Sequence, residues 1–165
     1  METKEQILAQ VLPQGVLEPL TLEARSALPQ CLRSITYVMI HKLPFRIGRE
    51  SRVRPTKGGL ERVERPSLAD DCASNNDLYL VDSGEKLNIS REHLQIELRD
   101  GNYVVADRGS ACGTHVGDSA IGGDGQLGVS HLCDGDTITI GTKTSPYQYR
   151  FFNFDGLKVV KKKTE

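Results

Sequence analysis

The 165-residue chain contains no tryptophan, has only 5% aromatic residues, and lacks any apolar run of the roughly 20 residues that a membrane-spanning helix needs. Its 21 basic and 22 acidic residues nearly cancel, which leaves a formal net charge of −1. Nucleic acids and anionic membranes attract proteins through an excess of positive charge. We therefore expect no membrane span, and neither a nucleic acid nor a membrane surface as the partner.

Cysteine is also scarce, and the four cysteines form no C-x-x-C pair. The segment Met1–Glu5 does not resemble a secretory leader, so reduced thiols and a cytoplasmic location are expected. Cys112, His115, His131 and Cys133 are together a set of soft ligands that zinc would accept. His131 and Cys133 are closer in sequence than the ligand pairs of most structural zinc sites. We expect no metal and no cofactor; a zinc-dependent enzyme is the alternative.

The length fits one domain with short extensions. We expect residues 1–31 to form an N-terminal helical segment, because Thr3 and Gln6 have the spacing of a capping box and a second short helix fits residues 20–28. Residues 155–165 contain three consecutive lysines and are expected to form a basic C-terminal tail.

Between residues 32 and 154 the apolar period changes to two, which is the period of a β-strand with one buried face. The expected strands cover residues 34–40, 45–47, 78–81, 94–98, 103–106, 137–140 and 148–154. Asp100-Gly101 between two of them is a strong signal for a two-residue hairpin turn. Many short strands with frequent turns predict an all-β sandwich or barrel.

Residues 50–77 interrupt this pattern. The 28 residues hold five basic and six acidic side chains and few large apolar ones. Such a composition buries too little apolar surface to offset the entropy of ordering the chain. We expect a long loop insertion in the domain.

Four short motifs follow one another along the β-rich region: Gly48-Arg49 at a strand end, Ser90-x-x-His93 before a strand, the loop 109–114 with the sequence GSACGT, and Gly135-Asp136 before another strand. Each motif alone is common. In this order, on an all-β pattern, they resemble the forkhead-associated (FHA) domain. The resemblance implies a sandwich of eleven strands in two twisted, mainly antiparallel sheets.

The same resemblance implies a non-enzymatic module whose loops bind phosphothreonine in a partner protein, such as a Ser/Thr kinase or its substrate. In that family pattern, Arg49 and Ser90 bind the phosphate and Arg91 supplies a second cation. Asn88 takes the place that reads the side chain three residues after the phosphothreonine. His93 buttresses the loops, with Gly48, Gly113 and Thr114 as further structural support.

The chain departs from the family pattern at Ala111 and Cys112, where the family usually has Thr and Asn. The usual Asn hydrogen-bonds the peptide backbone, a task for which Cys112 offers only a weak donor. Two functions therefore stay open: phosphothreonine-peptide binding, and binding of a partner independently of phosphate. Ser90 and His93 could also suggest a nucleophile and its base, but no orienting acid accompanies them in the sequence.

Overall fold

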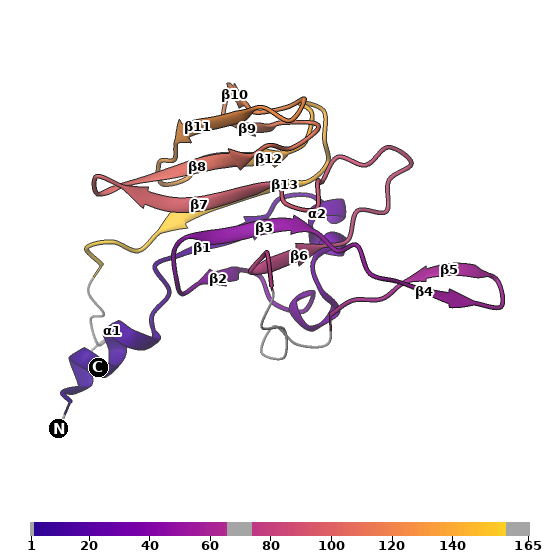
Figure 1. The fold of residues 1–165 in the computed structure, drawn as a ribbon. Coiled ribbons are helices and arrows are strands. Elements are labelled where there is room, and N and C mark those ends of the chain that lie inside the picture. The colour runs from indigo at the N-terminus through magenta and orange to yellow at the C-terminus, as the bar shows by residue number, and fades with distance from the viewer. Residues whose placement is uncertain (1, 66–73, 158–165) are drawn as a thin grey trace.

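The computed structural model describes residues 2–65 and 74–157, which fold around two facing β-sheets (Figure 1). The larger sheet has the strand order β10 (Ser119–Ile121), β9 (Thr114–Val116), β12 (Thr137–Ile140), β13 (Gln148–Asn153), β1 (Gly15–Pro19) and β2 (Val38–Ile40). The smaller sheet has the order β11 (Leu127–His131), β8 (Asn102–Arg108), β7 (Leu94–Arg99), β3 (Phe45–Arg49) and β6 (Leu78–Leu80).

Only β3 and β6 pair in parallel among the described strands, and the other pairs are antiparallel. The two sheets of six and five described strands confirm the predicted sandwich.

The core lies between the sheets and follows the predicted alternation. Leu94 and Ile96 on β7 are fully buried, whereas Gln95 and Glu97 on the same strand face outward. Opposite them, Ile138 on β12 and Phe151 on β13 fill the interior from the other sheet. The two-residue turn between β7 and β8 is also as predicted, because Asp100 and Gly101 both have positive φ values, 48° and 77°.

The N-terminal segment differs from the expected helical segment. Helix α1 (Lys4–Val11) forms with the predicted capping box, and none of its residues is buried. The following residues form β1, which pairs with β13 on one side and with β2 on the other. The sandwich therefore begins at Gly15 instead of residue 32. An interior strand of five residues is too short for its period to show, and Pro19 at its end reads as a break.

The second predicted helix is confirmed as α2 (Leu22–Ala27), which Thr21 caps, and a 3₁₀ turn η1 (Gln30–Leu32) follows. Ala24 and Ala27 are buried in the core cluster. The hydroxyl of Tyr149 donates to the carbonyl of Ala24 at 2.9 Å, which ties α2 to β13. Within the described ranges, no helix has the length and apolar content to cross a membrane.

The insertion 50–77 contains more structure than the predicted loop. Residues 53–62 form a hairpin of β4 (Val53–Thr56) and β5 (Gly59–Arg62), all of whose residues are exposed. Its backbone pairing and an Arg54–Glu61 ion pair of 2.8 Å hold it together without a core. Residues 66–73, and the three lysines of the expected basic tail, lie outside the described residues.

The glycine-rich region 109–131 forms short strands joined by tight loops, the arrangement that its ten glycines between residues 101 and 141 predict. β9, β10 and β11 have three to five residues each, and the sequence pattern did not give their individual positions. Frequent glycines separate them, and β10 and β11 are largely exposed, so neither periodicity nor hydrophobicity marks them.

Candidate functional site

The first three of the four motifs meet at one end of the sandwich. Arg49 is the last residue of β3, Ser90 and Arg91 precede β7, and Ala111 lies in the loop after β8. They border one open hollow of about 690 Å³. Its lining comprises Arg49, Asn75, Ser90, Arg91, Glu92, Arg108, Gly109, Ala111 and Gly125. The structure thus brings four of the predicted binding residues together around one polar depression.

Arg49 is half-buried and lines this hollow. Its Nε–H donates to the carbonyl oxygen of Ile89 at 2.9 Å, and its backbone N–H donates to the carbonyl of Ser90 at 2.9 Å. Burial lowers the pKa of Arg49, and the positive charges of Arg62 and Arg91 lower it further against the opposing charge of Asp82. The guanidinium stays cationic, because an ordinary arginine pKa is far above neutral. Among the described residues its two terminal amino groups have no partner, so they are left to donate to a ligand.

Ser90 also has hydrogen-bonding capacity left for a ligand. Its Oγ accepts the backbone N–H of Ala111 at 3.0 Å, which joins the loop before β7 to the loop after β8. A hydroxyl that accepts in this way still has its own proton to donate. Ser90 can therefore supply one donor beside the Arg49 guanidinium.

His93 is completely buried and holds the two loops from behind. Its Nδ1 accepts the backbone N–H of Ser90 at 2.9 Å, so the proton of the neutral ring is on Nε2, 2.9 Å from the Gly113 carbonyl that accepts it. Burial lowers the pKa of His93 and favours this neutral form. Because the ring bonds the Ser90 backbone and the Ser90 hydroxyl bonds Ala111, the pair lacks the hydroxyl–imidazole bond of an activated serine.

Two buried carboxylates that sequence reasoning missed shape the same loops. Asp107 accepts the backbone N–H groups of Gly109 and Ser110 and the hydroxyls of Ser110 and Thr114, at 2.7 to 3.0 Å. Asp82 accepts the backbone N–H groups of Gly84, Asn88 and Ile89 and the hydroxyl of Tyr147. The signal that could have found them is an Asp two residues before a glycine, the pattern of a turn closed by its own carboxylate.

A glycine is needed at position 48 for lack of space and not, as we expected, for its backbone conformation. Its φ is not positive, unlike that of Gly113 at 77° and Gly135 at 84°. A Cβ on Gly48 would instead lie 2.0 Å from the Arg91 carbonyl oxygen. That carbonyl accepts the side-chain amide of Asn76 at 2.7 Å. Because the neighbouring Ser90 carbonyl accepts the backbone N–H of Arg49, the loop before β7 packs directly on β3.

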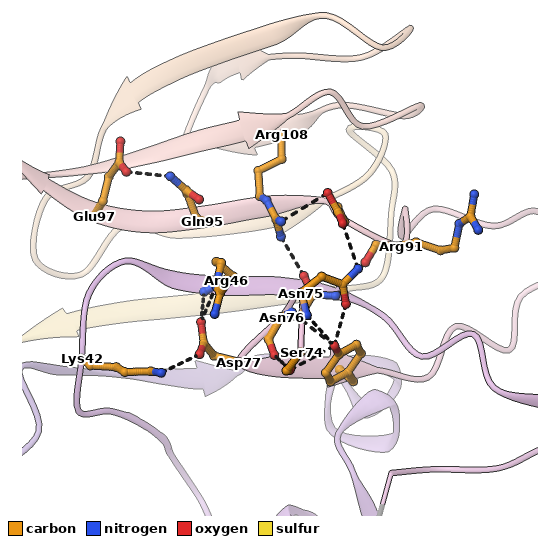
Figure 2. A network of polar contacts seen from close by, with 12 residues as sticks. Lys42, Arg46, Ser74, Asn75, Asn76, Asp77, Arg91, Gln95, Glu97 and Arg108 are labelled. Atoms are coloured by element: carbon orange, nitrogen blue, oxygen red, sulfur yellow. Dashed lines mark hydrogen bonds and ion pairs between the residues drawn. The ribbon is translucent and has the colours of Figure 1, made fainter. Parts of the chain in front are cut away.

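A polar cluster that the sequence did not reveal forms one wall of the hollow. Arg108 donates to the side-chain oxygen of Asn76 at 2.7 Å, a bond drawn in Figure 2, and it also pairs with Glu92 at 3.3 Å. Asn75 donates to Glu92 from the other side at 2.9 Å. The Arg91 side chain is exposed and points away from this cluster in the same view. The charges of Glu92 and Arg108 are thus matched with each other.

The remaining predicted binding residues, Asn88 and Cys112, lie outside the lining of the hollow. The Cys112 thiol donates to the Leu87 carbonyl at 3.4 Å. The Asn88 side chain accepts the hydroxyl of Thr142 at 3.3 Å and contacts Gly141. His115, a member of the alternative zinc set, contacts the Gly141 carbonyl at 3.2 Å. In the part of the chain that the structure describes, no three His, Cys, Asp or Glu side chains gather as a metal site.

A comparison with protein families identifies the chain. The family model of the FHA domain matches residues 45–141, the segment that contains all four motifs and the hollow. The chain belongs to the FHA family. FHA domains are interaction modules rather than enzymes.

The individual relatives either match only part of this chain or share few identical residues with it. An FHA domain-containing protein of Arabidopsis thaliana is 40% identical over 70 residues, a match that covers 42% of this chain and 16% of that protein. The solution structure of the FHA domain of an Arabidopsis thaliana hypothetical protein is similar over 92% of this chain and 94% of its own, with 20% identity and a TM-score of 0.49. The Mycobacterium tuberculosis EmbR protein in complex with a low-affinity phosphopeptide is similar over 93% of this chain and 29% of its own, with 20% identity and the same TM-score.

Proposed function

We propose that this FHA domain is a phosphothreonine-peptide-binding adaptor that reads the output of a Ser/Thr protein kinase. The observation that carries the proposal is the convergence of Arg49 and Ser90 on one hollow, each with donors left over for a ligand. A phosphothreonine carries about −1.5 to −2 charges at pH 7 and three acceptor oxygens. The hollow has the polarity and charge that such a group needs.

In the proposed complex, the two terminal amino groups of Arg49 bind two phosphate oxygens, and the Ser90 hydroxyl binds a third. Arg91 adds positive charge from the rim. Hydrogen bonds to charged groups contribute about 1.5–3 kcal/mol each. Because Ile89 and Ala111 already hold Arg49 and Ser90 in place, little side-chain entropy is lost when the phosphate binds.

The contact to the peptide backbone is weaker than the family pattern implies. Ala111 has no polar side-chain atom, and the thiol of Cys112 donates to Leu87 within the domain. Most of the affinity should therefore come from the phosphate. We propose the cytoplasm as the location, in keeping with the free thiols of Cys31, Cys112 and Cys133.

The test compares binding of matched phosphothreonine, phosphoserine and unphosphorylated peptide libraries to the domain. We expect the phosphothreonine library to bind best, and Arg49→Ala to reduce that binding about 30-fold or more. The matched control is Arg99→Ala, an exposed arginine of β7 that lies outside the lining of the hollow. Equal binding of all three libraries would overturn the proposal.

A second function is favoured by the same two residues, Ala111 and Cys112. With a reduced contact to the peptide backbone, the domain could bind its partner through another part of the loop surface, independently of phosphate. In that case a dephosphorylated partner binds as tightly as the phosphorylated one, and Arg49→Ala has no effect on either.

A further inference from the structure

The exposed hairpin starts next to the phosphate arginine. β3 ends at Arg49 and β4 begins at Val53, so the hairpin leaves the sandwich at the same end as the hollow (Figure 1). Its register pairs Val53 with Arg62, the last residue of β5. Arg62 is therefore at the base of the hairpin, beside the chain that leaves Arg49.

The base of the hairpin is anchored in the domain by a buried acid. Glu50 is 1% exposed, and its carboxylate accepts the backbone N–H of Arg52 at 2.9 Å and that of Arg65 at 3.3 Å. Its own N–H donates to the carbonyl of Leu80 on β6 at 2.8 Å. Both legs of the hairpin are thus bound to one carboxylate, which fixes the place of Arg62 relative to Arg49.

Arg49 and Arg91 line the hollow, and Arg62 lies at the base of the hairpin that begins four residues after Arg49. The positive charges of Arg62 and Arg91 both act on Arg49, whose pKa is lowered first by burial and then by them. Of the nearby acids, Glu92 is paired with Arg108, and the negative charge of Asp82 partly offsets the cations around Arg49. The lining of the hollow contains Arg49 and Arg91 but not Arg62, so a phosphate bound in the hollow is matched by the first two. Over residues 2–65 and 74–157 no acid pairs with the Arg62 side chain, in contrast to Arg54 and Glu61, which leaves its charge for another anionic group of the ligand.

We propose that Arg62 is a specificity-determining residue, which binds a second anionic group of the peptide, a carboxylate or a second phosphate, close to the phosphothreonine. This inference rests on the proposed function. The alternation of side chains along the hairpin puts Arg62 on one face with Val53, while Arg54 and Glu61 share the opposite face. Arg54, already paired with Glu61, is accordingly the matched control on the same hairpin.

The experiment uses a phosphothreonine peptide library in which each position from −3 to +3 is fixed in turn as Asp, phosphothreonine, Ala or Lys. Binding is measured for the wild type, Arg62→Ala and Arg54→Ala. At one position or more, we expect the wild type to prefer an anionic residue over Ala about tenfold. Arg62→Ala should reduce that preference to within about twofold, and Arg54→Ala should retain it. The Asp and phosphothreonine arms show which source supplies the second anion.

The inference is overturned if the wild type shows no anionic preference or if Arg62→Ala leaves the preference unchanged. Phosphate-dependent binding that Arg49→Ala abolishes would in that case leave the proposed function intact. If the wild type binds phosphorylated and unphosphorylated libraries alike, the proposed function fails, and the inference fails with it.

Discussion

Arg49 donates its Nε–H to the carbonyl oxygen of Ile89, and the N–H of the same Ile89 donates to the buried carboxylate of Asp82. The guanidinium that we assign to the phosphate is thereby oriented through one residue, Ile89, by an acid that does not line the hollow. A ligand-binding arginine held in this way loses little freedom on binding. The loop behind the site thus matters as much for affinity as the residues at its surface.

Replacement of Asp82 should therefore weaken both the fold and the site. Asp82→Asn puts an NH₂ group where two oxygens now accept N–H and O–H donors, so at least one buried donor is left unpaired. We expect a loss of about 2–4 kcal/mol in the free energy of unfolding and about tenfold weaker phosphopeptide binding. Urea titration and peptide anisotropy measure the two effects. Asp118→Asn, in an exposed turn, should change neither, and an unchanged Asp82→Asn variant would contradict the role of the carboxylate.

Stability should fall in mild acid because of His93. Its pKa in the folded protein is lowered, chiefly by burial, whereas the unfolded chain has the ordinary value of about 6.5. The stability that His93 contributes as a neutral, buried ring is fully present at pH values above about 6.5. It is lost as the pH falls through the lowered pKa, because the unfolded chain takes up the proton first. Urea midpoints measured between pH 7.5 and 5 should decrease more steeply for the wild type than for His93→Gln.

The exposed His41 provides the control for this pH effect. His41→Gln should retain the steep dependence of the wild type. Parallel curves for the wild type and His93→Gln would show that protonation of His93 is not the cause.

Replacement by alanine should lower the stability of the protein at Gly48 but not at Gly58. Gly48→Ala forces a Cβ to 2.0 Å from the Arg91 carbonyl, so we expect a loss of about 3 kcal/mol and a displaced Arg91 loop. Gly58→Ala, in the turn of the exposed hairpin, meets no atom within 4 Å and should stay within about 0.5 kcal/mol of the wild type. Thermal unfolding measures both variants, and equal midpoints would show that β3 and the Arg91 loop are not tightly packed.

Restoring the family residue at position 112 should strengthen binding. Cys112→Asn adds an amide that can hydrogen-bond the peptide backbone, worth about 0.5–1.5 kcal/mol, or roughly three- to tenfold in the dissociation constant of a phosphothreonine peptide. The exposed Cys133 follows His131, which pairs with Val104 at the end of β8 away from the loop 109–114, so Cys133→Asn should have no effect. A gain in both variants, or in neither, would mean that position 112 does not contact the peptide.

Sequence reasoning reached the sandwich because its evidence is local. Alternation in β7 and the Asp100-Gly101 turn depend on neighbouring residues, and both appear in the structure as expected. β1 escaped prediction because an interior strand of five residues, ending at Pro19, carries no period, and only its pairing with β13 and β2 makes it a strand. The hairpin at 53–62 escaped for a related reason: it is held by cross-strand pairing with all of its residues exposed.

The order of short motifs along the chain was enough by itself to indicate the FHA family, which the family model then showed, and to nominate Arg49 and Ser90, because motif spacing is a one-dimensional property. Which side chains share the hollow was decided by tertiary structure alone. Arg49 and Ser90 are 41 residues apart and meet because β3 pairs with β7. A hairpin register puts Arg62 at the base of the hairpin that follows Arg49, and Asn88 and Cys112 contact the neighbouring loops instead of lining the hollow. Such proximities depend on how distant segments pack, and no local pattern in the chain encodes them.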